Sequence, residues 1–383
     1  MLDHCVAGNS RPMFRKPSGE STLRISSVCL LLGATLFASA PATAATLEQM
    51  AGQMIVVGFQ GDSAADASVK AVRDDIAAGR IGGVMFLKVN VSSLENVAAM
   101  NQMFRAASPE LPPLITVDQE GGAVERLTEE VGFTEVPRAS VVARDYEPAE
   151  AEALYARMAA GLADLGFTIN FGPVVDINRN PNNQVIAKYG RAFGSDAETV
   201  TAYADAFVTA HHQAGLVTAL KHFPGHGSST ADSHEGFVDI TDTWDPVELE
   251  PYRALIAAGD ADMVMVGHLF HADYAAAPGE PSSLSRRWIE DVLRGELGFN
   301  GVVISDDLEM GAIRDHFTLE QTVVGGVEAG MDILLFSNTA NYRPSLGQEV
   351  LDILLAEAKA DPEFADRIEQ SYERIVTLKQ RID

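Results

Sequence analysis

The sequence predicts an α/β fold, a single (β/α)8 barrel with additional helices at its C-terminus. From residue 47 onward, eight short runs rich in Val, Ile or Leu alternate with longer amphipathic segments. The short runs do not alternate between polar and apolar residues, which is typical of strands buried on both faces of a parallel sheet. Eight such strands, each followed by a helix, favour a closed barrel over the alternative, a doubly wound open sheet.

The predicted strands are short apolar runs, and the predicted helices are Ala- and Glu-rich stretches between them. The strands are Met54–Phe59, Ile81–Leu87, Leu114–Val117, Thr168–Val175, Val217–Leu220, Met263–Val266, Val302–Ile304 and Ile333–Phe336. The helices are Ala64–Ala78, Ser92–Ala107, Pro148–Leu165, Ala197–Gln213, Pro246–Ala258, Arg286–Glu296 and Leu319–Ala329. Several are followed by Gly, as is common at helix C-termini. The spacing of Leu, Ile and Val after residue 344 predicts the terminal helices.

Residues 1–44 have the features of a secretory signal peptide: a basic segment, an apolar stretch and small residues for cleavage. The apolar stretch is shorter than the roughly 20 residues of a membrane span. We therefore expect one mature domain, residues 45–383, exported to the periplasm or the medium without stable membrane insertion. The alternative is a cytoplasmic protein with a misassigned start. The basic segment contains Arg11, Arg15, Lys16 and Arg24, and the apolar stretch is Val28–Ala40. The small residues for cleavage are Ala42-Thr43-Ala44 or, alternatively, Ala38-Ser39-Ala40.

Composition excludes several classes of function. Both cysteines, Cys5 and Cys29, fall in the predicted signal peptide. The mature chain would then have no disulfide, no thiolate nucleophile and no thiolate metal ligand. The chain carries 54 Asp and Glu against 28 Lys and Arg, a formal net charge of −26. Such a charge argues against binding to nucleic acid or anionic membranes. We also expect the protein to be a monomer.

Charged and imidazole side chains follow five consecutive predicted strands. In barrels of this class the active groups lie on the loops after the strands. Placing charged side chains at the ends of buried strands costs desolvation free energy. Five such strand ends in one chain therefore indicate a functional site. We therefore expect these groups to converge on one site at the mouth of the barrel. They are Asp118, Glu120 and Arg126; Asp176 and Arg191; Lys221 and His222; His268; and Asp306 and Asp307.

Paired carboxylates with a histidine and hydrogen-bonding cations suit the acid–base cleavage of a glycosidic bond. Asp306 directly follows a strand and is the predicted nucleophile. Alternation along the backbone should turn its neighbour Asp307 away, toward capping the next helix. His234 is the predicted acid/base, because imidazole exchanges protons near neutral pH. Asp232 can orient its ring by accepting a hydrogen bond, as in catalytic triads.

Four motifs together resemble glycoside hydrolase family 3, and more narrowly its β-N-acetylhexosaminidases of the NagZ type. The similarity runs from about residue 47 to about residue 337. The Asp-x-His motif discriminates most, because β-glucosidases of the family generally take the acid/base from a second domain. The motifs are Asp118-Gln119-Glu120-Gly121-Gly122, Lys221-His222-Phe223-Pro224-Gly225-His226-Gly227, Asp232-Ser233-His234 and Ser305-Asp306-Asp307-Leu308.

The resemblance implies a retaining mechanism through a covalent glycosyl-enzyme, with Asp306 as nucleophile, His234 as acid/base and Asp232 as its orienting partner. The implied substrate is a terminal β-linked N-acetylglucosamine, in peptidoglycan-derived muropeptides or chitooligosaccharides. No cofactor and no metal are implied. Residues that match the family's sugar-binding positions are Asp118, Arg126, Arg191, Lys221 and His222.

Two departures from the family pattern stand out. Ser228 occupies a position where the family often has Asp, and the segment before Arg191 is longer than usual. Three other functions remain alternatives: a β-glucosidase or β-xylosidase, a metalloenzyme using several histidines, and a non-catalytic glycan-binding barrel. The histidines of the second alternative are His222, His226 and His234.

Some side chains are assigned less fully. His226 either shapes its turn or contacts substrate, and His268 either lines the pocket or packs beneath it. Asp176 is predicted to be a structural carboxylate at a strand end. The adjacent residues His211 and His212 are predicted to lie on a helix and to face solvent.

Overall fold

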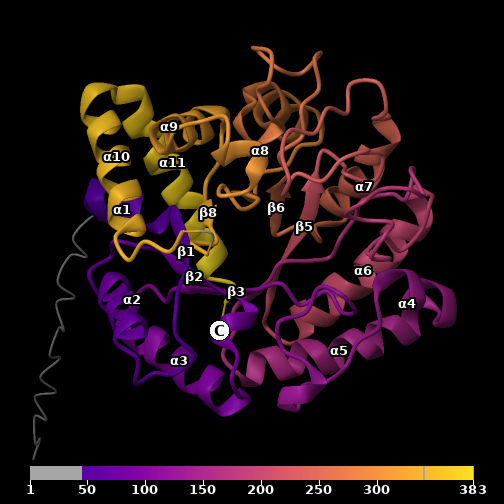
Figure 1. The fold of residues 1–383 in the computed structure, drawn as a ribbon, viewed down its shortest axis with the longest axis horizontal. Coiled ribbons are helices and arrows are strands. Elements are labelled where there is room, and N and C mark those ends of the chain that lie inside the picture. The colour runs from indigo at the N-terminus through magenta and orange to yellow at the C-terminus, as the bar shows by residue number, and fades with distance from the viewer. Residues whose placement is uncertain (1–44, 340, 383) are drawn as a thin grey trace, which may run out of the picture. The chain divides into compact units, whose positions relative to one another are not determined.

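Eight parallel strands surrounded by helices form the core of the fold (Figure 1). The computed structural model describes residues 45–339 and 341–382, so the predicted signal peptide lies outside the described residues. The strands pair in the order β7-β6-β5-β4-β3-β2-β1-β8. Their bounds are β1 Ile55–Gly58, β2 Gly83–Phe86, β3 Leu114–Val117, β4 Ile169–Asn170, β5 Val217–Phe223, β6 Met263–Val266, β7 Val302–Ser305 and β8 Leu334–Phe336.

The sheet closes on itself between β7 and β8. Ile304 and Ile333 form a parallel bridge there. The Ser305 amide donates to Ile333 O at 3.1 Å, and the Ile333 amide donates to Val303 O at 3.0 Å. The predicted barrel is therefore confirmed, and the open-sheet alternative is wrong. Closure leaves the barrel without free sheet edges and brings the carboxyl ends of all eight strands to one mouth.

The helices lie outside the strands (Figure 1). α6 and α9 begin and end where the sequence predicts. The α-helices are α1 Leu47–Gln53, α2 Ala67–Ala77, α3 Leu94–Ala107, α4 Ala139–Asp145, α5 Pro148–Asp164, α6 Ala197–Gln213, α7 Glu250–Ala258, α8 Gly311–Arg314, α9 Leu319–Ala329, α10 Leu346–Ala360 and α11 Pro362–Lys379. The short 3₁₀ turns are η1 Lys88–Asn90, η2 Glu129–Val131, η3 Pro246–Leu249 and η4 Ser282–Leu284, and η5 Arg287–Glu296 is π-helical.

The C-terminal helices pack beside the first helix, so the two ends of the described chain meet. α10 and α11 both lie against α1 (Figure 1). The buried Lys379 Nζ at the end of α11 donates to Gln53 Oε1 at 2.6 Å and to Gly82 O at 3.1 Å. The predicted terminal helices thus complete the outer layer. No helix in the described part of the chain is long and apolar enough to cross a membrane.

β4 and β5 are the strands whose C-terminal ends lie furthest from the predicted ones. β4 covers only Ile169–Asn170 of the predicted Thr168–Val175. Pro173 has no amide hydrogen to donate to a ladder, which limits regular pairing in this segment. β5 extends beyond the predicted Leu220 to Phe223, and its pairing with β6 shifts register between Leu220 and Phe223. Such an irregularity re-aims side chains at the end of a strand, and here it occurs at Lys221 and His222.

Candidate active site

A cavity of about 330 Å³ lies at the mouth of the barrel. All five predicted sugar-binding residues line it, and so do Asp306 and His234. Asp232 lies behind His234 and contacts its ring. The apolar part of the wall includes Met265, Met310 and Val185, which the sequence did not indicate as site residues because buried apolar side chains carry no local sign of function.

A chain of alternating charges forms one wall of the cavity. Lys221 Nζ lies 2.7 Å from Asp118 Oδ1 and 2.7 Å from Glu120 Oε1. Arg126 Nη2 lies 2.9 Å from Asp118 Oδ2. Arg191 binds both oxygens of Glu120, with Nε at 2.9 Å and Nη2 at 2.7 Å. Three cations and two carboxylates therefore present a dense array of fixed hydrogen-bonding groups.

Both carboxylates in this array are anionic. Burial alone would raise the pKa of Asp118, but Lys221 and Arg126 outweigh burial and hold that pKa below its usual value. Burial also opposes ionisation of Glu120, and Arg191 with Lys221 holds its pKa far below the usual range. Both carboxylates line the cavity, and each is paired with two cations.

Arg191 reaches the site despite the long segment that precedes it. Asn183, near the start of this segment, is buried and donates to His226 O at 2.8 Å. Its Oδ1 accepts from the amides of Val185 and Ile186 at 2.9 and 2.6 Å. The extra residues therefore fold against the loop after β5. This packing fixes the backbone from which Arg191 extends to Glu120.

His222 is held by partners on both ring nitrogens. Nδ1 lies 2.7 Å from Asp176 Oδ2, and Nε2 lies 3.2 Å from Arg191 Nη2. Because a guanidinium only donates, Nε2 is the acceptor and Nδ1 carries the proton. Asp176 Oδ1 also accepts from the His226 amide at 2.7 Å. Asp176 therefore ties the segment after β4 to the end of β5, as a structural carboxylate would.

Asp306 and Asp307 both line the cavity, so the prediction that Asp307 turns away to cap the next helix is wrong, but the two carboxyls differ in their contacts. The Asp307 amide donates to Asp306 Oδ1 at 2.8 Å. Burial would raise the pKa of Asp306, but the imidazoles of His222, His268 and His234 outweigh it and lower that pKa. Asp307 Oδ1 accepts from the amides of Glu309 and Ser337 at 3.1 and 2.8 Å, and burial raises its pKa. Asp306 is the more readily ionised of the two carboxyls.

His234 lies at the rim of the cavity, with its side chain 59% exposed. Its Nδ1 lies 2.8 Å from Asp232 Oδ1, which also accepts from the His234 amide at 2.9 Å. Burial would raise the pKa of Asp232, but these hydrogen bonds from His234 outweigh it and lower that pKa. Since the carboxylate accepts, Nδ1 carries a proton and Nε2 is left to exchange one with a ligand.

His226 and His268 differ in their position relative to the cavity. His226 lines the cavity, and its Nδ1 lies 2.6 Å from Ser229 Oγ. His268 is buried with Ser283 Oγ at 2.7 Å from Nδ1 and Asp307 O at 2.9 Å from Nε2. It therefore packs beneath the segment that carries Asp306 rather than in the cavity.

The prediction that His211 faces solvent is wrong. His211 is on α6 as predicted but fully buried, whereas His212 is partly exposed. His211 Nδ1 lies 2.8 Å from Phe207 O, and Nε2 lies 3.0 Å from Asn170 Nδ2. Asn170 in turn exchanges hydrogen bonds with the backbone of Gln119 at 2.9 Å each way. The histidine thus supports the strand end that carries Asp118, which its sequence neighbours do not reveal.

The metalloenzyme alternative requires a cluster of ligating side chains. In residues 45–339 and 341–382, no group of three or more His, Cys, Asp or Glu side chains is placed to hold a metal ion. Each histidine of the metalloenzyme alternative has another partner: His222 contacts Asp176, His226 contacts Ser229, and His234 contacts Asp232.

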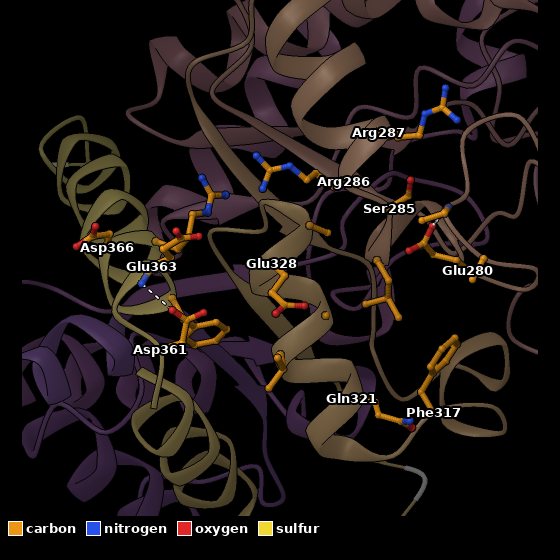
Figure 2. A pocket seen from close by; sticks show the side chains of 18 of the residues that line it. Glu280, Ser285, Arg286, Arg287, Phe317, Gln321, Glu328, Asp361, Glu363 and Asp366 are labelled. Carbon is orange, nitrogen blue, oxygen red and sulfur yellow. Dashed lines mark hydrogen bonds between the residues drawn. The ribbon is translucent and has the colours of Figure 1, made fainter. Parts of the chain in front are cut away.

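A larger cavity, of about 910 Å³, lies among the outer elements rather than in the barrel mouth. Figure 2 shows Arg286 and Arg287 on one side, Gln321 and Glu328 of α9 in the middle, and Asp361 on another side. It contains none of the predicted site residues. Its carboxylates and guanidinium groups are mostly exposed, so it lacks the buried converging groups of the barrel mouth.

The sequence matches one family model and several curated proteins. The model of the N-terminal domain of glycosyl hydrolase family 3 matches residues 46–378. A protein of Stenotrophomonas maltophilia (strain K279a) named beta-hexosaminidase is 39% identical over 272 residues, covering 69% of this chain and 78% of that protein. A protein of Xylella fastidiosa (strain 9a5c) with the same name is 37% identical over 291 residues, covering 74% and 82%.

Solved structures share the fold. A family 3 β-N-acetylglucosaminidase from Paenibacillus sp. (str. FPU-7) is 35% identical with a TM-score of 0.80, covering 88% of this chain. This chain spans 63% of that protein's length. A β-N-acetylhexosaminidase from Beutenbergia cavernae DSM 12333 is 30% identical with a TM-score of 0.77, covering 88% of this chain and 99% of that one.

Proposed function

This chain belongs to glycosyl hydrolase family 3 and is a glycoside hydrolase, and on that premise we propose that it is an exo-acting β-N-acetylhexosaminidase. The proposed substrate is a terminal β-linked N-acetylglucosamine in muropeptides or chitooligosaccharides. One observation carries the proposal: the 2.8 Å contact between His234 Nδ1 and Asp232 Oδ1, at the cavity that Asp306 also lines. The names of the relatives from Stenotrophomonas, Xylella, Paenibacillus and Beutenbergia support it.

The proposed mechanism has two steps and retains the anomeric configuration. Asp306 attacks the anomeric carbon while His234 Nε2 gives its proton to the departing glycosidic oxygen, which leaves a covalent glycosyl-enzyme. His234 then takes a proton from a water molecule, whose oxygen attacks the same carbon and releases Asp306. Asp232 holds the imidazole ring in one orientation and stabilises its cationic form.

The sugar-binding part of the proposal rests on the charged wall. Asp118 can accept a hydrogen bond from a hydroxyl, and the adjacent Lys221, Arg126 and Arg191 can donate to hydroxyl oxygens. Such groups lose binding free energy when a hydroxyl is missing, which favours a specific sugar. The modest volume of about 330 Å³ suits a single terminal sugar and supports exo action.

The test compares two nitrophenyl glycosides, the β-N-acetylglucosaminide and the β-glucoside, with and without a chelator. The proposal expects strong preference for the acetylated sugar, with no effect of the chelator. Preference for the glucoside, or for the corresponding xyloside, would overturn the substrate assignment in favour of the family's β-glucosidases or β-xylosidases. Binding without turnover of either glycoside or of a peptidoglycan digest would favour a glycan-binding barrel.

We also propose that the protein is exported to the periplasm or the medium after removal of residues 1–44. The basic and apolar segments of that stretch support this. N-terminal sequencing of the protein from a culture of its host should find a mature chain that begins near Ala45. A full-length chain recovered from the cytoplasm would contradict export. Size-exclusion chromatography with light scattering would test the expected monomer.

A further inference from the structure

The loop that carries His234 rests on the segment that carries Asp306. The Ala312 amide donates to Ser233 O at 3.1 Å, and the Gly311 amide donates to His234 O at 3.3 Å. Gly311 and Ala312 begin α8, a few residues after Asp306 in the sequence. The two proposed catalytic side chains are therefore linked through backbone hydrogen bonds between their own segments.

Close approach of the two backbones depends on the missing side chain of Gly311. A Cβ atom at this position would lie 2.8 Å from His234 O, 3.1 Å from Gly236 N and 3.2 Å from Glu235 C. All three atoms belong to the backbone of the loop, so they cannot rotate away as the end of a side chain could. Gly311 is buried and is not among the glycines with positive φ. An alanine would therefore fit the local backbone conformation, and the three atoms nearest to its Cβ would all belong to the loop.

A second contact holds the same loop from the other side. Ser233 lies between the two residues of the proposed acid/base pair, and its Oγ lies 3.4 Å from His226 Nε2. The same hydroxyl lies 3.9 Å from Met310 Sδ, next to Gly311. The loop is thus seated between the turn after β5 and the start of α8.

We propose that Gly311 is a positioning residue that sets how closely the His234 loop approaches the Asp306 segment. With glycine at this position, the loop docks by backbone contact and holds His234 over the sugar that Asp306 attacks. A side chain at position 311 separates the two segments and weakens proton donation to the leaving group. The inference rests on the proposed function through the acid/base assignment of His234.

The test compares Gly311→Ala with a matched control, Gly325→Ala, in the full chain. Both replace glycine by alanine in a helix, which does not lower helix propensity. At position 325 a Cβ would lie 3.8 Å from Leu284 Cδ2, an ordinary contact. The readout is kcat/KM for two aryl β-N-acetylglucosaminides, one with phenol and one with 2,4-dinitrophenol as leaving group. Only the poor leaving group, phenol, needs a proton from the enzyme.

We expect Gly311→Ala to lower kcat/KM for the phenyl glycoside at least about tenfold, within the range of general acid catalysis, and to change the dinitrophenyl value much less. Gly325→Ala should match the unmodified protein on both. Equal losses on both substrates, or no loss on either, would overturn the positioning role. Lack of turnover of either glycoside by the unmodified protein would instead contradict the proposed function.

A measurement without substrate keeps the two proposals separable. Hydrogen exchange of peptides covering residues 228–237 and 308–315 should be faster in Gly311→Ala than in Gly325→Ala. In 308–315 the Gly311 and Ala312 amides lose their acceptors more often, and in 228–237 the loop opens more often because it is no longer docked. Unchanged exchange in both peptides would overturn the docking inference whatever the activity.

Discussion

At the scale of single residues, hydrogen bonds decide which of two adjacent carboxylates is free to react. Asp307 already accepts two backbone amides, from Glu309 and Ser337. Asp306 is surrounded by imidazoles that lower its pKa despite burial. An ionised carboxylate with unshared lone pairs can attack a carbon atom, and one that accepts two amides serves to hold a turn.

Replacing the two carboxylates in turn should separate these roles. Asp306→Asn should lower kcat at least about a thousandfold, as expected for loss of a nucleophile. Asp307→Asn keeps an oxygen for the Glu309 and Ser337 amides and should lose far less activity. The measurement is kcat on the nitrophenyl N-acetylglucosaminide, with urea unfolding to check that both variants fold. Equal losses in the two variants would contradict the assignment.

At the scale of elements, the ends of β4 and β5 act as one unit through Asp176. This carboxylate accepts from His222 Nδ1 and from the His226 amide, both at 2.7 Å. Burial would raise the pKa of Asp176, but the imidazole of His222 and the hydrogen bond that it donates outweigh burial and lower that pKa. The carboxylate therefore selects the tautomer in which His222 Nε2 accepts from Arg191.

An amide at this position should disturb the tautomer while keeping the shape. In Asp176→Asn, the amide nitrogen would donate to His222 Nδ1 and so shift the ring proton to His222 Nε2. The protonated Nε2 would then face the donor groups of Arg191 and could not accept from them. We expect kcat/KM to fall about tenfold or more, mainly through KM, and stability to fall by about 1–3 kcal/mol. The exposed Asp242→Asn is the control. Unchanged KM in Asp176→Asn would show that the His222 tautomer does not affect sugar binding.

At the scale of the whole molecule, one buried acid beneath the site links stability to pH. Glu248 in η3 is buried, and its Oε2 accepts from the Gly227 amide at 3.0 Å. Burial raises its pKa from 4.5 to about 7. The pKa of Glu248 is higher in the folded protein than in the unfolded chain, so its protonated form stabilises the fold. This contribution is fully present below the unfolded pKa of 4.5 and is lost as the pH rises through the folded pKa of about 7.

A neutral replacement should remove this pH dependence. Glu248→Gln can still accept from the Gly227 amide and cannot ionise. Near pH 4.5 the variant and the unmodified protein should have equal free energies of unfolding. At pH 8 the variant should be more stable by about 3 kcal/mol, which is the pKa shift of Glu248 converted to free energy. Urea unfolding at both pH values measures the difference, with the exposed Glu320→Gln as control. A difference that does not grow with pH would contradict a buried, destabilising carboxylate.

Much of the fold and of the site could be read from local patterns. The runs that became β3 and β6 and the helices α6 and α9 have their predicted bounds. Apolar runs and capping residues act over a few neighbours, so they show in the sequence directly. The charged strand ends indicated the mouth of the barrel for the same reason, because a charged residue directly after an apolar run can be recognised in the sequence itself.

The tertiary structure alone decided which of these groups contact one another. Barrel closure between β7 and β8, the ion pairs of Glu120, and the reach of Arg191 all join residues far apart in the chain. The burial of His211 depends on Asn170. The meeting of Gly311 with the His234 loop also depends on distant contacts. The sequence determined the strands, the helices and the kinds of groups at the mouth, because those follow from neighbours along the chain. Burial and partners follow from neighbours in space, and only the closed barrel brings those together.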